Sequence, residues 1–233
     1  DLRARLLAEG ADSRALKDTG DRLSHEHLMA GLADAVAAGD AVLSEEGLDD
    51  ARRLDAERVW IVDPLDGTRE YGEPPRTDWA VHVALVDGAS GRPLAGAVAL
   101  PALGLTLATV APPPPPPPMT GPPRVIVSRS RPPAAAVFLT ERLGGETVTM
   151  GSAGAKAMAV VRGEADVYAH SGGQYEWDSC APVAVALAAG LHASRIDGSP
   201  LVYNNENPYL PDLLICRTEL ATPALDALAS FEG

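Results

Sequence analysis

Val59-Trp60-Ile61-Val62-Asp63-Pro64-Leu65-Asp66-Gly67-Thr68 places two carboxylates three residues apart, where an apolar run gives way to a polar turn. The apolar residues 59–62 predict a short buried strand. Pro64 holds the preceding residue extended and removes a backbone donor. Two carboxylates at a strand end, followed by the amides of Gly67 and Thr68, suit a magnesium ion and a phosphate ester. Asp, Pro and Gly are also ordinary turn residues, so acidic partners elsewhere must decide between a turn and a metal site.

Two such partners are present in the chain. Glu45 and Glu46 end the apolar run 41–43 and could reach the same metal if the two strands are neighbours; they could equally belong to a solvated charge run with Asp49 and Asp50. Asp178 lies at the N-terminus of an apolar helix that is predicted over 178–189 and ended by Gly190. A carboxylate there can cap the helix, and a capping residue at a cleft can also bind a metal.

Segments 41–71, 151–156 and 177–190 together resemble the inositol monophosphatase superfamily of magnesium-dependent, lithium-sensitive phosphatases. The Glu-Glu pair, the Asp-Pro-Leu-Asp-Gly-Thr motif and the Trp-Asp pair occur in the family's order. The resemblance implies two or three Mg²⁺ ions, held by Glu45, Asp63, the Leu65 carbonyl, Asp66 and Asp178. It also implies that Thr68 orients the attacking water, that Asp21 partners Thr68, and that Glu46 assists a metal-bound water. The family's loop before that acidic residue is longer than the segment 17–21 here.

Two further segments concern the substrate. Gly151-Ser152-Ala153 opens a predicted helix over 153–163 that includes Lys156, and its amides could face an anion or simply allow close packing. Strand 124–128 leads into Ser128-Arg129-Ser130, which could bind a phosphate bidentately or be a solvated loop. This loop resembles that of the CysQ-type 3′(2′),5′-bisphosphate nucleotidases. The substrate-binding residues implied are Gly67, Thr68, Ser128, Arg129, Ser130, Gly151, Ser152, Ala153 and Lys156.

The activity implied is that of a phosphoric monoester hydrolase, which removes the 3′-phosphate of 3′-phosphoadenosine 5′-phosphate by a metal-activated water and yields AMP. Inositol monophosphate and fructose 1,6-bisphosphate remain alternative substrates, and a metal- or nucleotide-binding protein without turnover remains an alternative class. A phosphatase that forms an aspartyl phosphate is excluded, because Pro64 stands where the nucleophilic Asp would lie. Asp66→Asn is expected to abolish turnover and leave the fold intact.

The composition of the chain limits the classes of molecule that it is expected to bind. The 233 residues carry a net charge of −13, from 19 basic and 32 acidic side chains, which argues against polymeric nucleic acid and anionic membranes. A small phosphorylated substrate would then need bound divalent cations as compensation. Apolar stretches are shorter than the roughly 18 residues of a membrane span, and a signal-peptide pattern is lacking, which favours a cytoplasmic location. Cys180 and Cys216 are expected to be buried thiols. The histidines are expected to be surface or core residues. The sequence does not decide between a monomer and a homodimer.

Residues 112–123 contain an unbroken run of prolines and divide the chain. We expect an N-terminal α+β lobe over 1–111, a proline-rich linker over 112–123 and a C-terminal α/β lobe over 124–233. Strands are predicted near 79–87, 94–100, 104–110, 166–170 and 212–217, and a helix near 134–143. The first helix is expected over 2–9. Together these elements predict a layered α-β-α-β-α sandwich, as in the superfamily, with the acidic residues in a cleft between the lobes.

Overall fold

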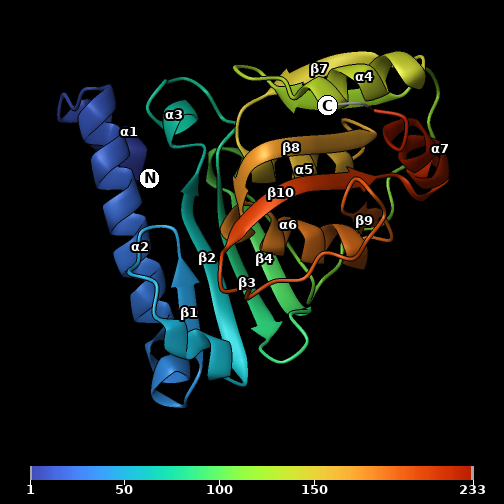
Figure 1. Cartoon of the computed structure of the whole chain (residues 1–233). Coiled ribbons are helices and arrows are strands. Elements are labelled where there is room, and N and C mark those ends of the chain that lie inside the picture. The colour runs from blue at the N-terminus through green and yellow to red at the C-terminus, as the bar shows by residue number, and fades with distance from the viewer. Residues whose placement is uncertain (1, 232–233) are drawn as a thin grey trace.

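The computed structural model describes residues 2–231. Its helices and strands follow one another as shown in Figure 1. The helices are α1 (Leu2–Ala8), α2 (Ser13–Ala37), α3 (Thr68–Tyr71), α4 (Ala134–Arg142), α5 (Ala153–Val161), α6 (Glu176–Ala188) and α7 (Thr218–Leu228), with short 3-10 turns η1 (Ala51–Asp55) and η2 (Pro101–Leu103). The strands are β1 (Ala41–Ser44), β2 (Arg58–Asp66), β3 (Ala80–Asp87), β4 (Pro93–Leu100), β5 (Leu105–Ala108), β6 (Arg124–Ser128), β7 (Glu146–Met150), β8 (Val167–Tyr175), β9 (His192–Ser194) and β10 (Tyr209–Cys216).

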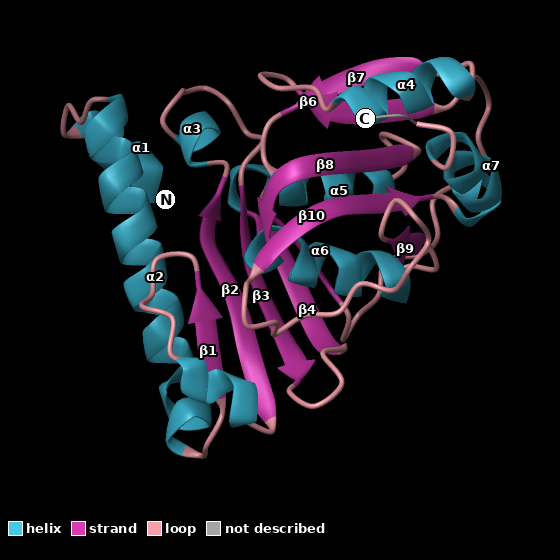
Figure 2. Ribbon diagram, in the orientation of Figure 1, coloured by secondary structure: helices cyan, strands magenta, loops and turns pink. Residues whose placement is uncertain are grey.

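These strands form two five-stranded sheets. The first has the order β1-β2-β3-β4-β5, in which β1 pairs parallel to β2 and the other pairs are antiparallel. The second has the order β7-β6-β8-β10-β9, with β6 parallel to β7 and β8. Helices α5 and α6 lie between the sheets, α2 covers the outer face of the first with α1 packed against it, and α4 and α7 cover the second (Figure 2). The layered α-β-α-β-α sandwich expected from the sequence is confirmed.

The central layer has the largest hydrophobic core, which draws on both sheets. Ile61 of β2, Met158 of α5 and Ile215 of β10 belong to one buried cluster. Residues 59–62 read as a continuous apolar run because α2 contacts one face of β2 and α6 the other. Helix α6 is buried along most of its length for the same reason. The end of β2 and the start of α6 therefore meet in the interior of the molecule.

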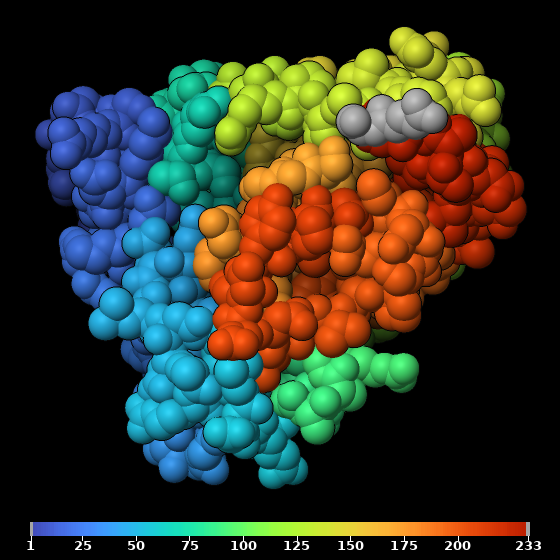
Figure 3. Space-filling view, viewed as in Figure 1, coloured from blue at the N-terminus to red at the C-terminus, as the bar shows by residue number. Residues whose placement is uncertain are grey.

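A network of hydrogen bonds links the turn η1 to the first turn of α6. In Figure 3 the segment around residues 200–210 lies against the chain around residues 50–60. The buried Arg53 guanidinium donates to Asn204 Oδ1 at 2.8 Å and to the Asn205 carbonyl at 2.8 Å. The Glu176 carboxylate in turn accepts from the backbone N–H of Asn204 at 2.6 Å. The first turn of α6 is thereby fixed to the first sheet.

The N-terminal expectations were wrong in one respect. Residues 17–21 were read as part of a shortened loop after a first helix over 2–9, but they lie inside α2, which runs for 25 residues. The Asp12 side chain caps this helix by accepting from the Ala15 N–H at 2.8 Å. Strand β7 was missed because its residues are polar and mostly exposed, as at a sheet edge.

The proline run links the first sheet to the second without regular secondary structure over 112–120. The Arg217 side chain donates to the Pro117 carbonyl at 2.7 Å, which ties the run to the second sheet. The division into lobes at 111 and 124 stays a prediction. Within residues 2–231, none of the helices combines the length and the apolar run that a bilayer crossing requires.

Asp166→Asn should destabilise the second sheet by about 2–3 kcal/mol at pH 7. The buried Asp166 carboxylate accepts from the Arg124 backbone N–H at 2.9 Å and from Arg124 Nε at 2.8 Å. Burial raises the pKa of Asp166, but these hydrogen bonds outweigh it and lower the pKa below its usual value. The contribution is therefore present above the unfolded pKa of about 4 and is lost as the pH falls through the folded pKa. Urea unfolding at pH 7 and pH 3 checks this, and equal stability of variant and wild type at pH 7 contradicts it.

Candidate active site

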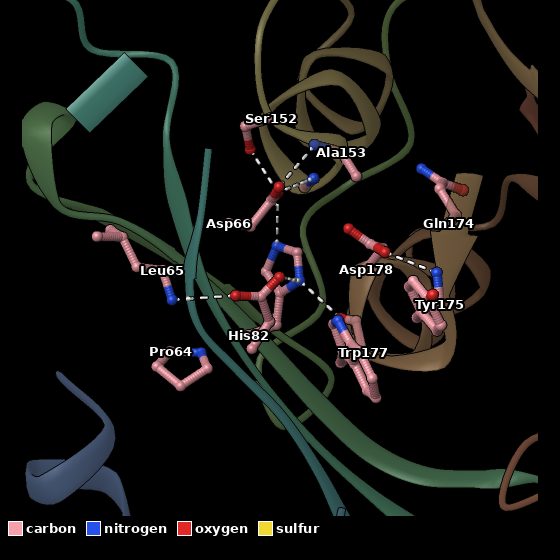
Figure 4. A network of polar contacts seen from close by, with 12 residues as sticks. Pro64, Leu65, Asp66, His82, Ser152, Ala153, Gln174, Tyr175, Trp177 and Asp178 are labelled. Atoms are coloured by element: carbon pink, nitrogen blue, oxygen red, sulfur yellow. Dashed lines mark hydrogen bonds and ion pairs between the residues drawn. The ribbon is translucent and has the colours of Figure 1, made fainter. Parts of the chain in front are cut away.

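Three carboxylates converge where β2 ends and α6 begins. Asp63 and Asp66 come from the end of β2 and Asp178 from the first turn of α6, and one oxygen of each lies within 4.8 Å of the others. Asp63 and Asp66 are buried, and Asp178 is partly buried. Figure 4 shows Asp66 and Asp178 facing the same space from different elements. The convergence expected from the sequence is therefore present in the structure for these three residues.

The three carboxylates repel one another. Burial raises the pKa of Asp63 well above its usual range, and the charges of Asp66, Glu45 and Asp178 raise it further. Burial and the charge of Asp66 raise the pKa of Asp178 to about 7. A hard divalent cation bound by oxygen ligands would remove this repulsion. The donor set therefore fits a metal ion of that kind.

Glu45 borders this trio but is not part of the tight group of three. Its backbone N–H donates to the Val62 carbonyl at 3.2 Å, directly beside Asp63, because β1 and β2 are parallel neighbours. Glu45 is exposed by its overall surface, yet the protein groups around its carboxylate desolvate it and raise its pKa, and a hydrogen bond with Asp63 opposes that rise. Glu46 is exposed and acts on Asp21 through its charge.

Asp66 is held at the N-terminus of α5. Its carboxylate accepts from Ser152 Oγ at 2.5 Å, from Ala153 N–H at 3.0 Å and from Gly154 N–H at 2.6 Å. Burial alone would raise the pKa of Asp66, but the contacts with His82 and Ser152 lower it to about 2. From the sequence, Ser152 and Ala153 are expected to face a substrate anion. In the structure the anion at this helix start is Asp66, so these residues position a candidate metal ligand.

Gly151 and Lys156 are likewise engaged within the protein. The Gly151 N–H donates to Asp78 Oδ2 at 2.6 Å. The Lys156 side chain is 5 % exposed, and its Nζ donates to the Ser152 carbonyl at 2.5 Å. This ammonium also lies 5.3 Å from the centre of the Tyr168 ring. Lys156 therefore stabilises the start of α5 through the Ser152 carbonyl. This contact is additional to the substrate-binding role expected from the sequence.

His82 is the site residue that sequence reasoning missed. The ring is fully buried, its Nδ1 lies 3.0 Å from the Trp177 carbonyl, and its Nε2 lies 3.2 Å from Asp66 Oδ2 (Figure 4). From the sequence, the histidines are expected to be surface or core residues, and His82 is a core residue. Strand alternation could have placed it on the inner face of β3, and its register partner on β2 is Asp63. The ring joins the two elements that carry the acidic trio.

Thr68 contacts both residues with which it was associated. Its Oγ1 lies 3.3 Å from Asp21 Oδ1 and 3.0 Å from the Leu65 carbonyl. Helix α2 can approach this closely because residue 20 is glycine, where a Cβ would lie 2.6 Å from the Tyr71 ring. Burial, followed by the charges of Glu46 and Glu45, raises the pKa of Asp21 to about 7. The Asp21–Thr68 pair therefore exists, with Asp21 supplied by a helix instead of a loop.

Gly67 precedes Thr68 at a turn that only glycine adopts readily, with φ of 85°. The four-residue helix α3 starts at Thr68, and the first N–H groups of a helix have no partner within it. The amides of Gly67 and Thr68 thus lie beside Asp66, at the edge of the acidic trio.

The loop after β6 lies opposite α3. Arg129 Nε donates to Glu70 Oε1 at 2.8 Å and its Nη2 to Glu73 Oε2 at 2.6 Å. Ser128 and Ser130 line a cavity of about 180 Å³ that also borders Gly67 and Ser152. Roomier cavities exist elsewhere, including an apolar one of about 370 Å³ that is lined by Gly20, Leu65 and Tyr71 among others. The small polar cavity adjoins the acidic trio through Ser152, which lines it and donates to Asp66.

Comparison with known proteins agrees with this geometry. The Inositol monophosphatase family profile matches residues 8–111 and 126–227. A 3′-phosphoadenosine 5′-phosphate phosphatase of Mycobacterium bovis is 53 % identical over 220 residues, which cover 92 % of this chain and 82 % of that protein. A 3′(2′),5′-bisphosphate nucleotidase CysQ of Shigella flexneri is 32 % identical over 201 residues, which cover 82 % of this chain and 80 % of that protein.

Solved structures have the same fold. CysQ from Bacteroides thetaiotaomicron superposes with a TM-score of 0.68 at 26 % identity, over 84 % of this chain and 83 % of that one. Inositol monophosphatase-II from Staphylococcus aureus superposes with a TM-score of 0.74 at 18 % identity, over 97 % of this chain and 90 % of that one. From the family match over both halves of the sequence and the acidic trio between the two sheets, it follows that this chain belongs to the inositol monophosphatase family.

Proposed function

We propose that this chain removes the 3′-phosphate of 3′-phosphoadenosine 5′-phosphate, giving AMP and orthophosphate. The observation that carries the proposal is the 53 % identity, over most of both chains, to a phosphatase named for that substrate. The acidic trio and the polar cavity beside it supply the parts that such a reaction needs. Inositol monophosphate and fructose 1,6-bisphosphate are the alternative substrates within the family.

Two or three Mg²⁺ ions are the proposed cofactor. The oxygen donors that would hold them are the carboxylates of Glu45, Asp63, Asp66 and Asp178 and the carbonyl of Leu65. When bound, such ions supply Lewis acidity toward the phosphate ester and the attacking water. The raised pKa values of Asp63 and Asp178 support this assignment, because they reflect burial first and the charges of neighbouring carboxylates second.

The protein's own contribution is orientation. By donating to Asp21, the Thr68 hydroxyl would leave the lone pairs of its oxygen available to accept a hydrogen bond from the attacking water and so orient it. Glu46, whose charge acts on Asp21, would assist from the cleft edge. The amides of Gly67 and Thr68 would donate to the equatorial oxygens as negative charge spreads over them. In-line attack by water needs no covalent intermediate.

Initial rates with three substrates test the proposal. We expect phosphate release in the presence of Mg²⁺ to have a larger kcat/KM for 3′-phosphoadenosine 5′-phosphate than for inositol 1-phosphate or fructose 1,6-bisphosphate. AMP should be the nucleotide product, and Li⁺ should inhibit the reaction. A larger kcat/KM for either other compound would reject the substrate assignment, and no turnover of any of the three would favour a binding protein.

A further inference from the structure

A small polar cavity adjoins Asp66 of the acidic trio. It has a volume of about 180 Å³ and is lined by Arg69, Ser128, Ser130, Arg131, Gly151 and Ser152, among others. Ser152 also donates to Asp66, so one wall of the cavity is in direct contact with the trio. The volume is below that of typical pockets for whole ligands, roughly 300–1,000 Å³. The cavity suits one end of a substrate whose reacting phosphate lies at the carboxylates.

The arginines around this cavity differ in whether they form ion pairs. Arg129 forms ion pairs with Glu70 and Glu73, at 2.8 Å and 2.6 Å, so its charge is already balanced. Arg69 and Arg131 are exposed, and within residues 2–231 neither guanidinium forms an ion pair. The cavity is therefore lined by two arginines without an acidic partner, Arg69 and Arg131, next to the ion-paired Arg129.

Uncompensated cations are informative in this chain because its net charge is −13. A dianionic group entering beside three carboxylates would be repelled unless local cations receive it. Guanidinium groups suit phosphate because their N–H donors match its oxygens in pairs. The Ser130 hydroxyl lies 3.5 Å from that of Ser128, so further donors face the same space.

We propose that Arg131 and Arg69 bind the second, non-reacting phosphate of the substrate, whereas Arg129 stays paired with Glu70 and Glu73. The inference rests on the proposed bisphosphate activity and deepens it. The sequence pattern alone pointed to Arg129, because the Ser-Arg-Ser string does not reveal which arginine meets a carboxylate from α3. Arg131 and Arg69 then distinguish a bisphosphate from a monophosphate.

Paired kinetics on 3′-phosphoadenosine 5′-phosphate and adenosine 3′-monophosphate test this, since the second compound lacks the non-reacting phosphate. For Arg131→Ala and Arg69→Ala, kcat/KM for the bisphosphate should fall at least about tenfold each, mainly through KM. Values for the monophosphate should stay within about twofold of wild type. Arg129→Ala is the matched control and should show no loss selective for the bisphosphate.

Two results would overturn the assignment while leaving the proposed function in place. One is that Arg131→Ala and Arg69→Ala leave kcat/KM unchanged for both substrates, or lower it equally for both. The other is a bisphosphate-selective loss in Arg129→Ala alone. If the wild-type chain releases phosphate from neither compound, the proposed function fails, and this inference fails with it. Thermal melts of each variant separate loss of folding from loss of binding.

Discussion

Asp63→Asn is expected to lower kcat by at least about 10³-fold and, in the absence of metal, to make the protein more stable. The Asp63 carboxylate is 1 % exposed, and its burial, followed by the charges of Asp66, Glu45 and Asp178, raises its pKa. A neutral amide removes that repulsion, keeps the oxygen that accepts from the Leu65 N–H at 3.0 Å, and removes a proposed metal ligand. We expect a gain of roughly 1–3 kcal/mol in chelator.

Phosphate release and urea unfolding in EDTA measure the two effects separately. Mg²⁺ should raise the melting temperature of the wild type and have little effect on Asp63→Asn, because only the folded wild-type site binds the ion. Turnover near the wild-type rate, or lower stability of the variant in EDTA, would contradict the role given to Asp63.

Asp66→Asn is the contrasting variant. Asp66 accepts from Ser152 Oγ and from the N–H groups of Ala153 and Gly154, so an amide nitrogen would face at least one of these donors. From the sequence alone, this change is expected to abolish turnover and leave the fold intact. The contacts predict loss of turnover together with about 1–3 kcal/mol of stability. Opposite stability changes in the two variants would separate a ligand held by the fold from one that strains it.

Gly154→Ala should be the most damaging single-methyl change at the site. A Cβ at residue 154 would lie 1.9 Å from His82 Nε2 and 2.8 Å from its Cε1. The ring cannot move aside at low cost, because it is fully buried and lies 3.0 Å from the Trp177 carbonyl. We expect a loss of about 2–4 kcal/mol and, because His82 leaves Asp66, a fall in kcat of at least about tenfold.

Gly31→Ala in α2 is the matched control. A Cβ there would meet nothing within 4 Å, and glycine inside a helix costs about 0.5–1 kcal/mol relative to alanine, so this variant should be more stable than wild type. Denaturant unfolding and phosphate release compare the two. Equal stability of Gly154→Ala and wild type would mean that His82 is not held as described.

The sequence could predict the acidic framework because each ligand ends a local pattern. Residues 59–62 lie in the buried strand β2, which continues through Asp63 to Asp66, and Asp178 lies in the first turn of the apolar helix α6. The Glu-Glu pair, the Asp-Pro-Leu-Asp-Gly-Thr motif and the Trp-Asp pair occur in the order of the family, and this resemblance predicted the layered sandwich. The pairing of Thr68 with Asp21 was also predicted, although residues 17–21 are helical.

The rest depended on which distant groups meet, and local patterns do not contain that information. A helix start such as Ser152-Ala153 favours an anion, but its sequence does not say whether the anion is a substrate or Asp66. Arg129 is recognisable as a phosphate-binding type, but its partner Glu70 is 59 residues away in the chain. His82 looks like one more core residue until the β2–β3 register sets it opposite Asp63.

Diffraction from crystals soaked in Mn²⁺, a stand-in for Mg²⁺ with an anomalous signal, would test the central claim most directly. The account predicts anomalous peaks between Asp63, Asp66 and Asp178, with further ligation by Glu45 and the Leu65 carbonyl, and their disappearance in Asp63→Asn. A map without a peak at this trio, or with the ion bound only elsewhere, would contradict it.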